Sequence, residues 1–89
     1  MLKVYSVFDS VSGSYGPLFL STNDGVAMRE LKGSIVPGNF LATDPGDYQL
    51  HCLASFDESK GIFETMPYDQ FLVIRVTNLV GDDLEKKRV

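Results

Sequence analysis

Two stretches of similar sequence decide the fold: residues 8–15, Phe8-Asp9-Ser10-Val11-Ser12-Gly13-Ser14-Tyr15, and residues 56–63, Phe56-Asp57-Glu58-Ser59-Lys60-Gly61-Ile62-Phe63. Both follow the pattern F-D-x-x-x-G-x-aromatic. An aspartate at the end of a strand can accept hydrogen bonds from loop amides, and glycine tolerates the left-handed conformation that closes a short loop. We therefore predict two β-hairpins, with Asp9, Gly13, Asp57 and Gly61 as structural turn residues and the aromatic side chains meeting across the strands. The similarity leaves open a duplicated unit or convergent turn chemistry.

The segments around the first turn alternate as β-strands do. Residues 2–8 are rich in β-branched and aromatic residues, and we expect this strand in the interior of a sheet. Residues 15–20 are the second strand of the hairpin, and Pro17, which has no amide hydrogen, places it at a sheet edge. One face of the first strand carries Leu2, Val4 and Phe8, and the other carries Lys3, Tyr5 and Val7.

Three further strands are predicted in the second half of the chain. The Pro45-Gly46 pair predicts a type II turn with the glycine at positive φ. Residues 48–56 and 62–66 alternate and form the second hairpin. Residues 71–77 open with a continuous apolar run, which is typical of a strand covered on both faces.

One helix is predicted between the hairpins. The cluster Ser21-Thr22-Asn23-Asp24 consists of good N-cap residues, and Pro37-Gly38 stops helix propagation. Glycines within the helix weaken it, so packing must stabilise it. The apolar side chains of its buried face are Ala27, Met28, Leu31 and Ile35.

These elements predict a single α+β domain over residues 1–81, with an antiparallel sheet of about five strands in the order β-β-α-β-β-β and one main helix on one face. Residues 82–89 are predicted to form a charged C-terminal tail, frayed or shortly helical. A chain of 89 residues buries limited surface on folding. Self-association would add buried area, and we therefore expect a homo-oligomer.

The composition excludes several classes of function. The formal net charge of −4 has the wrong sign for non-specific attraction to DNA phosphates or anionic lipid. No apolar run approaches the length of a membrane span, and residues 1–8 lack the features of a signal peptide, so we expect no contact with a membrane. Cys52 is the only cysteine and lies in an apolar segment, which suits a reducing compartment.

No motif commits the chain to a reaction. His51 and Cys52 are neighbours on a strand, so their side chains point to opposite faces and cannot form a dyad or share a metal ion. Carboxylates at the second hairpin tip, such as Asp57, are solvated and should keep ordinary pKa values. We expect no enzymatic activity, no cofactor and no metal site.

A nucleic-acid site would combine aromatic side chains that stack on unpaired bases with cations that contact phosphates. For the aromatic residues the alternative is a place in the core, and for Arg75 it is a side chain that reaches solvent at the sheet rim. The candidate nucleic-acid-binding residues are Lys3, Tyr5, Arg75, Lys86, Lys87 and Arg88.

Three passages, in residues 1–10, 44–50 and 55–63, resemble a known family. They read Met1-Leu2-Lys3-Val4-Tyr5-Ser6-Val7-Phe8-Asp9-Ser10, Asp44-Pro45-Gly46-Asp47-Tyr48-Gln49-Leu50 and Ser55-Phe56-Asp57-Glu58-Ser59-Lys60-Gly61-Ile62-Phe63. In this order they are similar to the small nonstructural protein of gokushovirus-like microviruses, which are single-stranded DNA phages. The resemblance runs from residue 1 to about residue 66. It implies a DNA-binding-labelled phage protein that works in genome production or packaging in the bacterial host cytoplasm, and it transfers no catalytic residue.

Two functions are therefore open. In the first, a homodimer holds single-stranded phage DNA with sheet aromatics and cationic tails, or hands it to replication or packaging proteins. In the second, the chain is an acidic interaction module without direct nucleic-acid contact. Its sheet edge or its strand at residues 71–77 would engage a host or phage protein, and its negative charge would select a basic partner.

Overall fold

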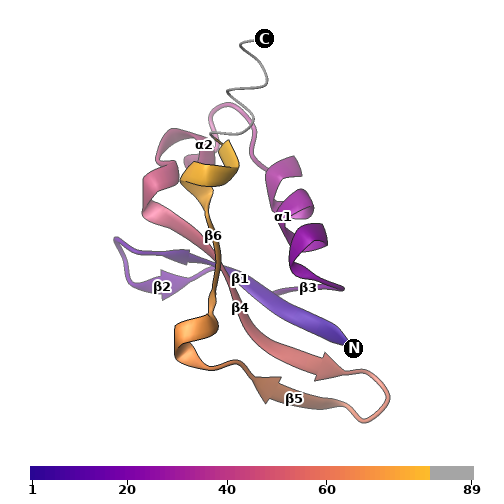
Figure 1. Cartoon of the computed structure of the whole chain (residues 1–89). Coiled ribbons are helices and arrows are strands. Elements are labelled where there is room, and N and C mark those ends of the chain that lie inside the picture. Colours follow the sequence, from indigo (N-terminus) through magenta and orange to yellow (C-terminus); the bar gives the residue numbers. More distant parts are fainter. Residues whose placement is uncertain (81–89) are drawn as a thin grey trace.

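The centre of the sheet is the antiparallel pair of its two longest strands, β1 (Leu2–Asp9) and β4 (Tyr48–Asp57) (Figure 1). The computed structural model describes residues 1–80, so the predicted charged tail at residues 82–89 lies outside the described residues. All strand pairs are antiparallel, and the fold is α+β as predicted. Strands β2 (Ser14–Tyr15) and β3 (Phe19–Ser21) pair with the outer edge of β1. Strands β5 (Ile62–Thr65) and β6 (Leu72–Arg75) pair with the outer edge of β4.

The first predicted hairpin turn is confirmed. Gly13 has a φ of 72°, and its amide donates to the carbonyl of Asp9 over 2.8 Å. Oδ1 of Asp9 accepts hydrogen bonds from the amides of Val11 and Ser12, at 2.9 and 3.3 Å. The aspartate side chain thus replaces the hydrogen-bond partners that the loop amides lack.

The second hairpin turn has the same construction. Gly61 has a φ of 67° and donates to the carbonyl of Asp57 over 2.7 Å, while Oδ1 of Asp57 accepts from the amides of Ser59 and Lys60. The aromatic pairs meet across both hairpins, with ring centroids 4.9 Å apart for Phe8 and Tyr15 and 4.7 Å apart for Phe56 and Phe63.

The second predicted strand, residues 15–20, is wrong as one continuous element. It breaks into β2 and β3 on either side of Pro17, which has no amide hydrogen to donate to β1. This split gives the sheet six strands within residues 1–80. It also changes the alternation, because Tyr15 is the partner of Phe8 and Leu20 the partner of Val4, so that both lie on the same face.

The last predicted strand is shorter than residues 71–77. β6 has four residues, and residues 76–80 are helical. Leu72 is 47% exposed, so this strand is not covered on both faces. Val73 and Ile74 of the apolar run pack against the core, and Val76 and Leu79 are buried in it from the helical turn that follows.

Helix α1 (Asp24–Gly33) follows the prediction. Oδ1 of Asn23 accepts from the amide of Val26 over 2.9 Å, which caps the first turn. Ala27 and Leu31 are buried, and Met28 and Ile35 pack against the core from the same helix face.

The connection from α1 to β4 differs from the prediction. It contains a second helix, α2 (Phe40–Thr43), and a 3-10 helix (Pro45–Asp47) where a type II turn was expected. Gly46 does not have a positive φ, whereas Gly38 has a φ of 87° in a turn closed by Asn39 N–H to Val36 O at 3.0 Å. The glycine with positive φ is therefore the one in the other Pro-Gly pair, Pro37-Gly38. A further 3-10 helix covers Tyr68–Gln70.

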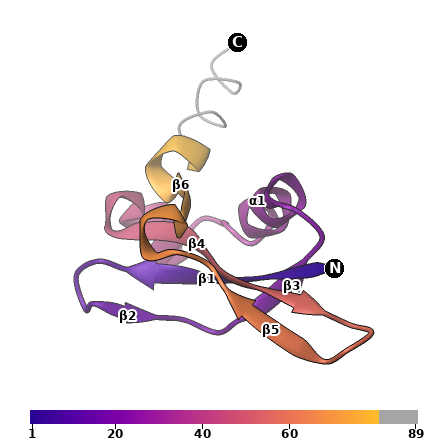
Figure 2. The same cartoon turned by 60° about the horizontal axis from the view of Figure 1, so that its bottom comes forward.

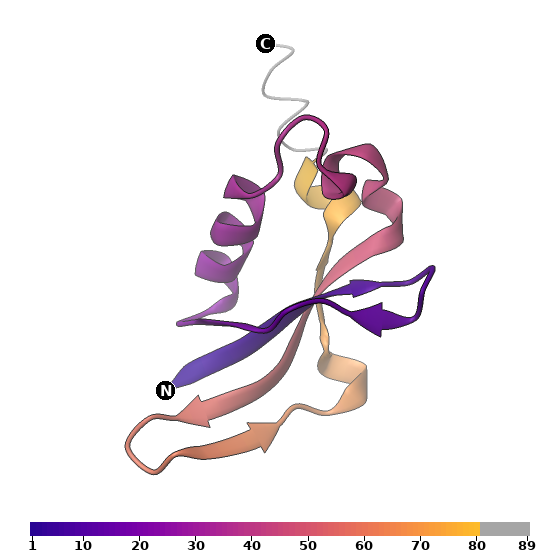
Figure 3. The same ribbon diagram turned by 180° about the vertical axis from the view of Figure 1, so that it is seen from behind.

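The helices gather on one side of the sheet. Helix α1, α2 and the helical residues 76–80 lie on the same side of β1 (Figures 2 and 3). The core forms between them and the sheet, where Tyr5, Leu50 and Val76 have no exposed surface. The alternate residues of β1 and β4 face away from these helices.

Replacing Gly13 or Gly61 with alanine should destabilise the protein by about 1 kcal/mol each, because alanine disfavours the left-handed backbone. Gly33→Ala is the matched control, since Gly33 ends α1 without positive φ and a Cβ there meets open space. Its stability should stay equal or rise. Urea unfolding measures all three variants, and a Gly13 variant as stable as the Gly33 variant would contradict this turn assignment.

Candidate functional site

Tyr5, a candidate for stacking on bases, lies in the core. Its side chain has no exposed surface, its ring stacks on Phe19 with centroids 5.6 Å apart, and its hydroxyl donates to Oδ1 of Asp24 over 2.6 Å. Burial, reinforced by the Asp24 carboxylate, raises the pKa of the Tyr5 hydroxyl. Tyr5 thus fastens the first turn of α1 to the sheet, and its assignment as a base-stacking residue is wrong.

Lys3 lies on the same face as Tyr5. Its Nζ is 3.7 Å from Oδ1 of Asp24, and its side chain is 40% exposed. The two candidates converge on one carboxylate at the start of α1. Asp24 offsets the positive charge of Lys3, which makes Lys3 a weak phosphate contact.

Arg75 lies on the opposite face of the sheet. The register pairs it with Gln49, whose other neighbour across β4 is Phe8, and Arg75 is exposed. This agrees with the alternative of a guanidinium that reaches solvent at the sheet rim. The remaining candidates, Lys86, Lys87 and Arg88, lie outside the described residues.

A linked set of rings occupies the face that carries Arg75. We call it the aromatic face: Phe8, Tyr15, His51, Tyr68 and Phe71. His51 is central, with ring centroids 5.1 Å from Phe8, 5.5 Å from Tyr15 and 6.2 Å from Phe71. Tyr68 extends the set through Phe71, at 5.0 Å. Tyr15 is 42% and Tyr68 90% exposed, so rings at the margin remain open to a ligand.

Two hydrogen bonds fix the ring of His51. Its Nε2 is 2.9 Å from Oε1 of Gln49, and because that oxygen only accepts, Nε2 carries the hydrogen. Nδ1 of the neutral ring then accepts from the hydroxyl of Tyr15 at 3.0 Å. Burial lowers the pKa of His51, which favours this neutral form. The arrangement holds Tyr15 in place on the aromatic face.

The other titratable side chains offer little chemistry. Cys52 is buried on the face opposite His51, and burial raises the pKa of its thiol. A hydrogen bond of 2.7 Å from the Ser59 hydroxyl lowers the pKa of Asp57, which corrects the expectation of an ordinary value. Within residues 1–80, no three His, Cys, Asp or Glu side chains gather as a metal site would require.

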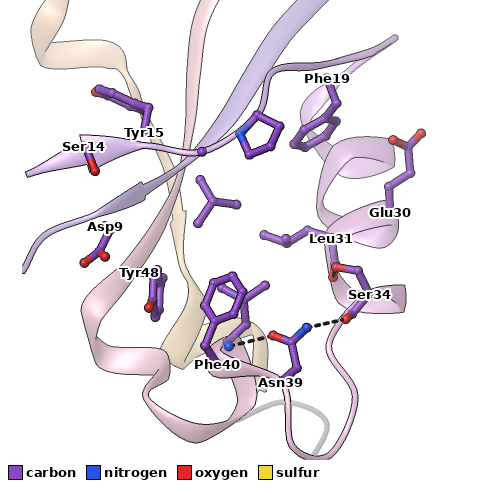
Figure 4. Close-up of a pocket in the computed structure, with 14 residues that line it drawn as sticks. Asp9, Ser14, Tyr15, Phe19, Glu30, Leu31, Ser34, Asn39, Phe40 and Tyr48 are labelled. Carbon is purple, nitrogen blue, oxygen red and sulfur yellow. Dashed lines mark hydrogen bonds between the residues drawn. The ribbon is translucent and has the colours of Figure 1, made fainter. Parts of the chain in front are cut away.

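A groove on the helix side of the sheet was not predicted (Figure 4). It has a volume of about 690 Å³ and lies between β1, the first hairpin, α1 and α2. We call it the helix-side groove. The sequence gives no signal for this groove, because α2 has only four residues and therefore no recognisable helical periodicity. Its walls include Phe19, Leu31, Phe40, Leu41 and Tyr48, with Asp9 and Glu30 as the charged lining residues.

The fold is that of a small α+β protein with two candidate binding surfaces, the aromatic face and the helix-side groove. Comparison with known families shows which family it belongs to. The family model of the Phage ORF5 protein matches residues 2–79, and the chain belongs to this family of phage proteins. No curated protein and no solved structure matches the chain. Within residues 1–80, no helix has the length and apolar character needed to cross a bilayer.

The hydrogen bond between Tyr5 and Asp24 can be tested by Tyr5→Phe. This variant keeps the buried ring and loses only the hydroxyl, so stability should fall by about 1 kcal/mol. Tyr68→Phe is the control, because this side chain is 90% exposed and its change should be near zero. Equal urea midpoints for the two variants would argue against the attachment of α1 through Tyr5.

The lowered pKa of His51 predicts a pH dependence of stability. The unfolded chain binds the proton more readily than the folded one, so stability should fall as the pH drops from about 7 to about 5, through the ordinary histidine value of 6.5. His51→Gln should flatten this part of the profile. Urea unfolding at several pH values measures it, and a wild-type stability that rises toward acid in this window would refute the assignment.

Proposed function

We propose that this phage protein is a non-enzymatic binder of single-stranded DNA that acts in genome replication or packaging in the host cytoplasm, as a homo-oligomer. The observation that carries the proposal is the aromatic face, with exposed rings at its margin and Arg75 on the same side of the sheet. Unpaired bases stack on such rings regardless of sequence.

The rings are suited to stacking because their positions are set before any ligand arrives. The rings of Phe8, His51 and Phe71 form a contiguous surface, and the hydroxyl of Tyr15 is hydrogen-bonded to His51. Tyr68 lies at the outer end with most of its surface in solvent. Little conformational entropy would be lost on binding a base there.

Phosphate contacts would contribute less than stacking. Of the 12 acidic and 8 basic residues, three of each lie in residues 82–89, which leaves nine acidic and five basic residues in the described part. The cations that we assign to phosphate contacts are Arg75 and the tail residues Lys86, Lys87 and Arg88. Each contact adds about 0.7 to the slope of log affinity against log salt for a single strand, and a second copy would double them.

A homodimer would also cover apolar surface at the sheet edge. Leu18 and Leu20 are 64% and 49% exposed at the β3 edge, and Phe63 on β5 is 63% exposed. These side chains are candidates for the contact between copies.

The second candidate function, an acidic module for a phage or host protein, is favoured by one observation. Carboxylates outnumber cations in the described residues, and the helix-side groove carries the negative groups Asp9 and Glu30. Such a surface selects a basic partner.

Fluorescence anisotropy with a labelled oligothymidine of about 20 nucleotides tests DNA binding. Tyr68→Ala and Arg75→Glu should each weaken affinity, by about tenfold for the lost stacking ring. Arg29→Glu is the matched control, because Arg29 is an exposed cation on α1 and its replacement changes the net charge equally. Its affinity should stay near that of the wild type.

Changing Lys86, Lys87 and Arg88 together to glutamate should lower the affinity and the salt slope. Absence of oligothymidine binding by the wild-type protein at low salt would remove the DNA hypothesis. Equal losses for the Arg75 and Arg29 variants would show that only net charge matters and not the aromatic face.

A further inference from the structure

The helix-side groove presents an open apolar surface of fixed shape. Leu31 and Leu41 lie at its base, while Phe40 is 58% exposed and its ring centroid lies 5.1 Å from that of Tyr48. An exposed ring that packs on a half-buried one beside a concave apolar surface is typical of a site that receives an apolar side chain.

Asn39 holds this wall of the groove. Its Oδ1 accepts from the amide of Leu41 over 2.8 Å, and its Nδ2 donates to the carbonyl of Ser34 over 3.5 Å (Figure 4). The first turn of α2 is thus connected to the end of α1. The groove exists without a ligand, so binding would require little rearrangement.

The charge of the groove has one sign. Asp9 and Glu30 lie on opposite sides of it (Figure 4), and within residues 1–80 no lysine or arginine lines it. At the groove wall, partial burial raises the pKa of Tyr48, and the nearby carboxylates of Asp9, Asp47 and Asp44 raise it further. A phosphate or another anion would be repelled.

This combination defines the ligand chemistry. The carboxylates on opposite sides fit two cationic side chains, and the apolar base between them fits an aliphatic or aromatic residue. A nucleotide or an anionic lipid headgroup lacks these features, whereas a basic peptide segment has them.

We propose that the helix-side groove binds a basic segment of a partner protein in which two cationic residues flank an apolar side chain. The segment's apolar residue lies against Phe40 and Leu31, and its cations face Asp9 and Glu30. This inference rests on the second candidate function, a protein partner, and not on DNA binding at the aromatic face. Tyr15 borders both surfaces, but His51, Phe71 and Tyr68 of the aromatic face do not line the groove.

Fluorescence anisotropy of a labelled peptide with two arginines flanking a Leu-Phe pair tests the proposal on the full chain. Glu30→Lys should weaken binding by at least about fivefold, because it places a cation in the groove. Glu64→Lys changes the net charge equally at an exposed position on β5 and should stay within about twofold of the wild type.

A second pair of variants tests the apolar contact. Phe40→Ala should weaken peptide binding by at least about fivefold, while Ile62→Ala, which truncates an apolar side chain of similar exposure on β5 away from the groove, should not. A control peptide with glutamates in place of the arginines should not bind. Circular dichroism verifies that every variant remains folded.

Three results would overturn the proposal. Equal losses for the two lysine variants would mean general charge attraction. Binding that appears only after residues 82–89 are removed would make the chain's own tail the occupant. Displacement of the peptide by oligothymidine would mean a shared site. Because peptide and oligothymidine are titrated separately, failure of either proposal is seen without loss of the other.

Discussion

The antiparallel pairing of β1 with β4 is the constraint on which the rest of the structure depends. Every other strand pairs with one of these two, and α1 is attached to their centre through the Tyr5 hydroxyl and Asp24. A slip of one residue in this pairing would turn Tyr5 out of the core and the ring of Phe8 toward the helices. The turns that begin at Asp9 and Asp57 fix the register of β2 against β1 and of β5 against β4.

Features set by local chemistry could be predicted from the sequence. The two hairpin turns need only a capping aspartate and a glycine, and the start of α1 needs only Asn23 as its cap. The Pro-Gly pairs show where local chemistry is insufficient. Each pair is compatible with more than one type of turn, and packing decides between them. Gly38 adopts a positive φ, whereas Gly46 lies in a 3-10 helix. A Cβ at position 46 would point toward the hydroxyl of Thr77.

The candidate site was less predictable because the alternation of side chains between the two faces of the sheet is interrupted at irregular points in the strands. The break at Pro17 puts Tyr15 on the face of Phe8, and a bulge in β4 leaves Leu53 without a partner between Val4 and Tyr5. Simple alternation contains no signal for either. Within β1, alternation correctly predicts that Tyr5 and Phe8 lie on opposite faces. It does not predict which of these faces the helices cover.

We assign DNA to the aromatic face and a basic peptide to the helix-side groove. Chemical-shift mapping by two-dimensional NMR with oligothymidine tests this separation most directly. We expect the largest shifts at His51, Tyr68 and Arg75, and none at Glu30 or Phe40. Shifts centred on Glu30 and Phe40, with the aromatic face unchanged, would contradict the account.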